Sequence, residues 1–175
     1  MAVKANQGGT MAEEGEWHRR IREEIMAILR SNNLRFLHDH GEGGRPLRLF
    51  KTDNMERTHL SDADILIFDD TGGVVQIIEV MGGNVTPKYM VGIAGATTLC
   101  DAFIDSDNVR HELRKPTVWI VLDHKRIRDK GPKKHKRMEV ILRELQRRDS
   151  PLVRLDNTAG IKICYDDTFE EEFVT

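Results

Sequence analysis

The stretch that decides the fold covers residues 61–88 and reads SDADILIFDDTGGVVQIIEVMGGNVTPK. It holds two short apolar runs, at 65–68 and 74–80, that are separated by residues favouring turns. Two β-rich runs joined in this way predict a hairpin. Asp64 opens the first run, and Glu79 stands near the end of the second. Carboxylates are costly inside a hydrophobic sheet unless they are paired or hold a cation, so the same stretch also indicates a site.

The composition predicts a globular protein of one domain. The chain has 175 residues, of which 39% are hydrophobic and 32% are charged, and this is enough for a substantial core. No run approaches the roughly 20 apolar residues that span a membrane, and the polar start lacks the apolar centre of a secretory leader. Cys100 and Cys164 have no metal-ligand spacing. We expect them to be reduced core thiols rather than a disulfide, as is typical of a cytoplasmic protein.

The pattern along the chain predicts an α/β fold with a mixed central sheet flanked by helices. Residues 1–12 are expected to form a flexible tail, and residues 13–175 a single domain. Strands are expected near residues 47–51, 63–69, 74–81, 117–122 and 161–165. Helices are expected near residues 13–30, 86–104 and 137–148. The Thr86-Pro87 pair suits the start of the second helix, because Thr can cap and Pro fits the first helical position.

The two carboxylates are expected to lie together at one rim of the sheet. Side chains alternate between the faces of a strand, so Asp64 shares a face with Leu66, and Glu79 shares one with Ile77. The hairpin register decides whether these faces coincide, because a slip of one residue would separate the acids. With the backbone carbonyl of Val80, the pair would suit Mg²⁺ or Mn²⁺. The alternative is that each acid caps a strand end, one solvated and the other paired with an arginine.

The run Ala63-Asp64-(x)14-Glu79-Val80-Met81, in an α-β-β-β-α-β order, resembles the motif of the PD-(D/E)XK nuclease superfamily. The likeness covers about residues 13–123 and includes restriction endonucleases and Holliday-junction resolvases. It implies a restriction endonuclease-like αβββαβ core and a Mg²⁺- or Mn²⁺-dependent enzyme that hydrolyses phosphodiester bonds in DNA. In that family the Asp and the Glu bind the metal, which assigns this role to Asp64 and Glu79. Ala63 stands where the family often has proline.

Met81 departs from the family motif, because it occupies the position of the lysine that orients or activates the attacking water. A thioether can neither donate a proton nor carry a charge. Three hypotheses remain open. Lys88, at the start of the next helix, could supply the missing ammonium as a third catalytic residue; the metal alone could suffice; or the chain could be catalytically inactive.

Three further residues are candidates near this pair. Glu24 is expected on the apolar face of the first helix, where acids help to hold metal in some members of the resembled family. Its alternative is an ion pair with Arg20 or Arg48. Asp62 could support the metal ligands from a loop before Asp64, and His59 in the same loop is expected to be a surface residue.

The net charge of −2 hides a basic block. Residues 124–148 hold 11 Lys or Arg and 3 acids, a net of +8, which leaves −10 for the rest of the chain. Such a block predicts contact with the phosphates of DNA, although a solvated helix and loop would have the same composition. The residues expected to bind DNA are Lys125, Arg126, Arg128, Lys130, Lys133, Lys134, Lys136 and Arg137.

The sequence therefore favours a small metal-dependent DNA endonuclease of the type II restriction enzyme kind. We expect a homodimer, because cutting both strands of a two-fold duplex usually takes two sites. A second hypothesis is a catalytically inactive module of the same fold that binds DNA or a partner subunit. A third is an unrelated metabolic α/β protein whose basic block holds a phosphorylated small molecule.

Overall fold

The computed structural model describes residues 11–39, 46–53, 56–82, 85–129, 136, 137, 139–141, 143, 144, 147 and 157–174. Its strands are β1 (Arg35–His38), β2 (Leu47–Asp53), β3 (Glu56–Ala63), β4 (Ile65–Phe68), β5 (Val74–Met81), β6 (Ala102–Ile104), β7 (Arg110–Leu122) and β8 (Gly160–Tyr165). Its helices with defined bounds are α1 (Met11–Ser31), α2 (Pro87–Leu99), α3 (His124–Asp129) and α5 (Phe169–Val174). The described residues between 136 and 144 are also helical.

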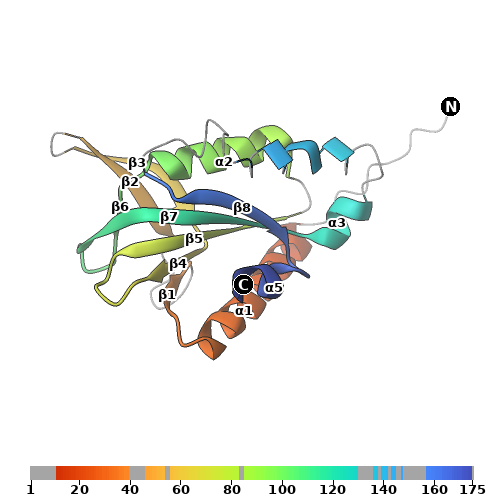
Figure 1. Cartoon of the computed structure of the whole chain (residues 1–175), viewed down its shortest axis with the longest axis horizontal. Coiled ribbons are helices and arrows are strands. Elements are labelled where there is room, and N and C mark those ends of the chain that lie inside the picture. Colours follow the sequence, from red (N-terminus) through yellow and green to blue (C-terminus); the bar gives the residue numbers. More distant parts are fainter. Residues whose placement is uncertain are drawn as a thin grey trace.

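The eight strands form one mixed sheet. Seven of them follow the order β1-β4-β5-β7-β6-β2-β3, and β8 pairs with β7 along the edge opposite β5. Strand β7 runs parallel to β5 and to β8, whereas the remaining pairs are antiparallel. Helices α1 and α5 cover one face of the sheet, and α2 covers the other (Figure 1). A mixed sheet with helices on both faces was expected from the sequence and is confirmed.

The hairpin of β4 and β5 forms as the sequence predicts. All four residues of β4 are buried, and Ile65 pairs with Ile78 across the ladder. In the turn, the Asp69 carboxylate accepts the backbone N–H groups of Thr71 and Gly73, each at 2.9 Å. Hydrogen bonds from the Thr71 side chain and from these N–H groups lower the pKa of Asp69 to about 2. The polar turn thus holds a buried pair of strands in register.

The sheet separates two apolar layers. On one face, Ile21, Ile25 and Leu29 of α1 pack on alternate residues of the hairpin, including Ile65 and Ile78. On the other face, Met90 and Ala94 of α2 pack with Val118, Ile120 and Met81. The parallel connection from β5 to β7 therefore places α2 directly above the end of β5, because the crossover helix must cover the sheet between its strands.

Several elements were missed or misplaced by the sequence analysis. The first helix begins at Met11 rather than at residue 13, and residues 1–10 of the expected tail lie outside the described residues. The strand expected at 63–69 is broken by a bend at Asp64, which separates β3 from β4. The helix expected to reach residue 104 ends at Leu99, and β6 follows it.

The missed strands share a polar composition. Strand β3 reads ERTHLSDA, and the first half of β7 reads RHELRK, so neither shows the apolar alternation that predicts a half-buried strand. Strand β1 reads RFLH and alternates between exposed and half-buried side chains. Helix α3 lies inside the expected basic loop, and α5 lies inside the expected acidic tail. No helix in the described ranges has the length and apolar character needed to span a membrane.

Candidate functional site

Asp64 and Glu79 meet at one end of the β4–β5 ladder. Ile65 pairs with Ile78 at this end of the ladder, and the next residue on each strand is Asp64 on one side and Glu79 on the other. The backbone N–H of Asp64 donates to the carbonyl of Ile78 at 3.2 Å, and its carbonyl accepts the N–H of Asp39 at 2.7 Å. Leu66 and Ile77 belong to the same apolar cluster, so the two strands present matching faces. The carboxylate of Asp64 contacts α1, whereas Glu79 lines a pocket beside α2.

The Asp64 carboxylate is held by two groups. Its Oδ2 atom accepts the backbone N–H of Val80 at 2.7 Å, which places the carboxylate close to the plane of the sheet. The Nε2 atom of His18, on α1, lies 3.2 Å from Oδ1 and 3.3 Å from Oδ2. The hydrogen bond to Asp64 is the main cause that raises the pKa of His18. Asp64 is thus oriented before any ligand arrives.

Glu79 has no such support. Its side chain is 8% exposed, and its Oε1 atom is fully covered without a hydrogen-bond partner. Burial raises the pKa of Glu79 well above its usual range, and the negative charges of Asp64, Asp62 and Asp39 raise it further. A buried carboxylate among other acids is costly unless a cation joins them. The donor set, all hard oxygens, fits a divalent ion such as Mg²⁺ or Mn²⁺.

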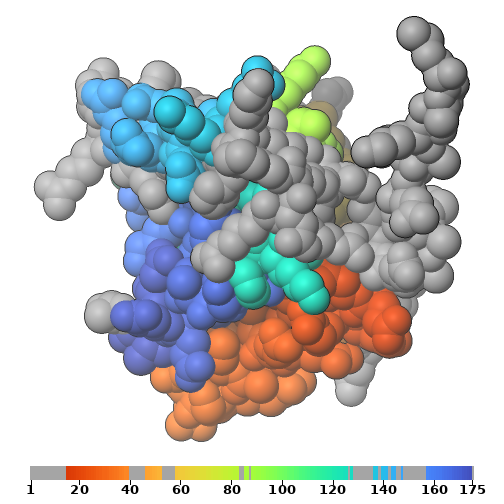
Figure 2. All heavy atoms as spheres, turned by 90° about the vertical axis from the view of Figure 1, so that its right-hand side faces the viewer, coloured from red at the N-terminus to blue at the C-terminus, as the bar shows by residue number. Residues whose placement is uncertain are grey.

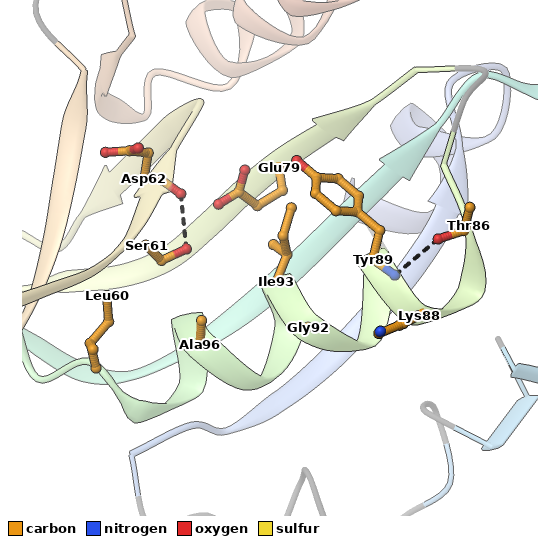
Figure 3. A pocket seen from close by; sticks show the side chains of 10 residues that line it. All are labelled: Leu60, Ser61, Asp62, Glu79, Thr86, Lys88, Tyr89, Gly92, Ile93 and Ala96. Carbon is orange, nitrogen blue, oxygen red and sulfur yellow. Dashed lines mark hydrogen bonds between the residues drawn. The ribbon is translucent and has the colours of Figure 1, made fainter.

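A pocket of about 680 Å³ gives access to Glu79 from the side of α2. Its walls are β3, β5 and α2, and Asp62 and Lys88 line it together with Glu79 (Figure 3). The Thr86 hydroxyl caps α2 by accepting the N–H of Tyr89 at 3.2 Å, and Pro87 stands in the first helical turn, as predicted. The cap fixes the backbone of the first helical turn, from which the side chains of Lys88 and Tyr89 extend.

No protein-family model, curated protein or solved structure matched this chain.

Lys88 lines the pocket but does not contact the carboxylate in this structure. It is exposed, and within the described ranges no ion pair or hydrogen bond joins it to Glu79. In Figure 3 its ammonium lies at the surface of α2, whereas Tyr89 and Ile93 point toward the side of β5 where Glu79 lies. The assistance expected from Lys88 stays a prediction that requires its flexible stem to swing inward.

Met81, at the position of the family lysine, is a core residue. It is 4% exposed and packs with Val85, Met90 and Ile127 beneath α2. An ammonium placed there would be surrounded by apolar side chains on the α2 side, which explains why an apolar residue fits the position. The position at which the resemblance would place a lysine therefore belongs to the core packing of this chain.

Glu24 does not lie on the apolar face of α1, and that expectation was wrong. Its side chain is 58% exposed and lies 3.9 Å from Arg20, which is the alternative that the sequence left open. The buried residues of α1 centre about 100° around the helix from Trp17, toward Ile21, Ile25 and Leu29. The prediction was wrong because it took Trp17 as the centre of the apolar face of α1. The structure does not bring Glu24 to Asp64 or Glu79.

Asp62 and His59 lie on β3 rather than in a loop. The His59 ring lies 3.0 Å from the Asp62 carboxylate, and both side chains are exposed. His59 is therefore a surface residue, as expected. Asp62 lines the Glu79 pocket and adds to the negative charge there, which keeps it as a supporting residue for a cation.

The sequence analysis did not single out His18. It precedes Ile21 and Ile25 at helical spacing, so its position on the inner side of α1 could have been found. Its contact with Asp64, 46 residues away in the chain, could not.

A second group of ligand-type side chains lies at the ends of β7 and β8. The Nδ1 atom of His124 lies 2.8 Å from Asp166 and 3.6 Å from Asp167. Among the described residues, these three form the one group of three or more His, Cys, Asp or Glu side chains whose ligand atoms all lie within 4.8 Å of one another. The backbone N–H of His124 also donates to Asp166 at 3.0 Å, so the pair fixes the start of α3 to the end of β8.

The basic residues expected to bind DNA are described only in part. Lys125, Lys136 and Arg137 are exposed. The side chains of Arg126, Arg128, Lys130, Lys133 and Lys134 lie outside the described part of the structure. Helix α3, which begins the basic stretch, lies beside the first turns of α1 (Figures 1 and 2). It is therefore on the same side of the molecule as His18 and Asp64.

Proposed function

We propose that this chain is a metal-dependent DNA endonuclease that hydrolyses phosphodiester bonds. The observation that carries the proposal is the Glu79 carboxylate, which is buried, has no hydrogen bond and lies among acids across the ladder from Asp64. Binding a cation would stabilise such a carboxylate. The ion would be held by Asp64, Glu79 and the carbonyl of Val80, with Asp62 nearby.

The order of the elements supports the same proposal. Helix α1, the antiparallel strands β1, β4 and β5, helix α2 and the parallel strand β7 follow one another as in a restriction endonuclease-like αβββαβ core. The strands β2 and β3 are inserted between β1 and β4. We assign the three antiparallel core strands to β1, β4 and β5, so that the strand expected near residues 47–51 belongs to the insertion.

The chain's own residues have separate roles in this proposal. The Val80 N–H orients Asp64, so that one carboxylate is fixed while Glu79 adjusts to the ion. A divalent ion bound there supplies a more acidic water and charge stabilisation for a phosphate. Lys88 lines the pocket from α2, and its flexible stem would swing inward to assist proton transfer or charge stabilisation. The basic stretch beginning at Lys125 holds the DNA backbone, and a homodimer would cut both strands.

Plasmid cleavage in the presence of Mg²⁺ tests this function. We expect Asp64→Asn and Glu79→Gln to lower the rate by at least about a hundredfold, because the ion supplies several kcal/mol of charge stabilisation. Glu24→Gln, which changes an exposed acid on α1, is the matched control and should cleave at the wild-type rate. Lys88→Ala should lose about a hundredfold if it assists proton transfer. Cleavage by Glu79→Gln at the wild-type rate would refute the proposal.

Met81 favours one second candidate, a catalytically inactive module of the same fold that binds DNA or a partner subunit. The lysine position is filled by a buried thioether, and Lys88 has no contact with Glu79 in this structure. This candidate predicts DNA binding that falls with salt and does not change with divalent ions. Binding measured with and without Mn²⁺ separates the two candidates, because the endonuclease should bind the ion through Asp64 and Glu79.

A further inference from the structure

Arg22, on α1, is buried without a partner. The residue is 8% exposed, and its Nε and Nη1 atoms are fully covered and make no hydrogen bond. No ion pair involves Arg22 anywhere in the described ranges. The third nitrogen, Nη2, is not among the covered unpartnered atoms, so it connects the guanidinium to solvent. A buried guanidinium in this state is costly, because lost hydration is not replaced by an anion.

Several other arginines of the described chain have partners. Arg20, two positions earlier on the same helix, is 61% exposed and lies 3.9 Å from Glu24. Arg114 contacts Asp69 at 2.8 Å, and the guanidinium of Arg30 lies 5.7 Å from the centre of the Phe36 ring. Arg22 differs from these residues because it is both buried and unpaired. The protein thus bears the cost of a desolvated cation on the inner side of α1.

The place of Arg22 relates it to the carboxylate site. It lies one helical turn after His18, whose ring contacts Asp64, and side chains four residues apart are neighbours on a helix. The positive charge of Arg22 acts on the His18 ring and opposes its protonation, which is consistent with this short separation. An anion at Arg22 would therefore lie next to the ion expected at Asp64 and Glu79.

We propose that Arg22 binds a backbone phosphate of the DNA beside the cleavage site and so positions the strand. This inference rests on the proposed endonuclease function. A guanidinium donates charge-assisted hydrogen bonds to phosphate oxygens, and these are stronger than bonds between neutral groups. The phosphate would approach through Nη2 and supply the counter-charge that the protein lacks. Arg22 is a positioning residue in this account, and the cleavage chemistry belongs to the carboxylate site.

The test measures the melting temperature and the DNA affinity of the same variant. The melting temperature should rise, and the DNA affinity should fall. Arg22→Met keeps an unbranched apolar stem and removes the guanidinium with its charge. In metal-free protein we expect its melting temperature to rise by about 3 °C, because a desolvated charge is gone. In EDTA, its dissociation constant for a short fluorescein-labelled DNA duplex should rise at least about tenfold. A merely structural arginine would lower stability when removed and would leave the affinity unchanged.

Arg20→Met is the matched control, because it removes an exposed arginine from the same helix. We expect its melting temperature to stay within about 1 °C of wild type and its DNA affinity to fall by less than about threefold. Arg22→Lys keeps the charge without the planar fork and should bind DNA with an affinity between those of wild type and Arg22→Met. A lower melting temperature for Arg22→Met, or a loss of affinity no larger than that of Arg20→Met, would overturn the assignment. If wild-type protein binds DNA through Arg22 but leaves plasmid intact, the endonuclease fails and the phosphate site stands.

Discussion

Asp64 and Glu79 each lie one residue beyond the Ile65–Ile78 pair that ends the β4–β5 ladder, and only Asp64 has a hydrogen-bond donor. The Val80 N–H lies 2.7 Å from the Asp64 carboxylate, whereas the covered oxygen of Glu79 has no partner. The ladder therefore holds one oriented acid beside one destabilised acid. We expect this difference to lower the stability of the metal-free protein and to favour binding of a cation.

Glu79→Gln should stabilise the protein in the absence of metal. The amide keeps the shape of the side chain and removes a buried charge that lies among Asp64, Asp62 and Asp39. We expect a gain of about 1 kcal/mol, or about 3 °C in melting temperature, in EDTA. Differential scanning calorimetry measures this directly. A melting temperature lower than that of wild type would mean that Glu79 makes a stabilising contact, contrary to the site described above.

His18→Ala should destabilise the metal-free protein by about 1 kcal/mol. The His18 ring is 32% exposed on its side chain and lies 3.2 Å from the buried Asp64, so the contact is partly shielded from solvent. Urea unfolding at neutral pH gives the change in free energy of unfolding. His59→Ala is the matched control, because His59 makes a similar contact with Asp62 on the surface, and it should change stability by less than about 0.5 kcal/mol. Equal effects of the two substitutions would contradict this account.

Asp101 should make the free energy of unfolding depend on pH in the acidic range. Burial alone would raise its pKa, but hydrogen bonds from Thr52 and Lys51 outweigh burial and lower it. Because the folded pKa is below the unfolded one, the unfolded chain binds more protons, and this stabilisation is present above the usual pKa of about 4 and lost as the pH falls through the folded value. Asp101→Asn should therefore cost about 1–2 kcal/mol at pH 7 and progressively less below about pH 4. If Asp101→Asn destabilised the protein equally at pH 7 and below about pH 4, the charge of Asp101 would not contribute to stability, contrary to this account.

The two thiols should be unreactive in the native protein. Cys100 and Cys164 are buried and free, and burial raises the pKa of Cys100 to about 12 and that of Cys164 further still. Since the thiolate is the reacting form, Ellman's reagent at pH 8 should label neither residue in native protein. Both should react after denaturation in guanidinium. Rapid labelling of either thiol in native protein would place it in a more open environment than the one described.

The hairpin was predictable because two apolar runs, at 65–68 and 74–80, flank residues that favour a turn, whereas the sequence left its register open. The strands β1 and β3 were not, since their sequences are polar or only partly apolar and they form through pairing with neighbours distant in the chain. The same limit applies to the site. The sequence identified Asp64 and Glu79, but the environments of His18 and Arg22 depend on how α1 packs against the sheet. Glu24 was misplaced because the apolar stripe of α1 is centred away from Trp17.

The central claim, a divalent ion shared by Asp64 and Glu79, is tested most directly by isothermal titration calorimetry with Mn²⁺. Wild-type protein and the Glu24→Gln control should bind the ion with equal affinity. Asp64→Asn and Glu79→Gln should each weaken binding by at least about tenfold, because each removes one of the two charged ligands. Binding of Mn²⁺ by Glu79→Gln with the affinity of wild type would contradict the claim.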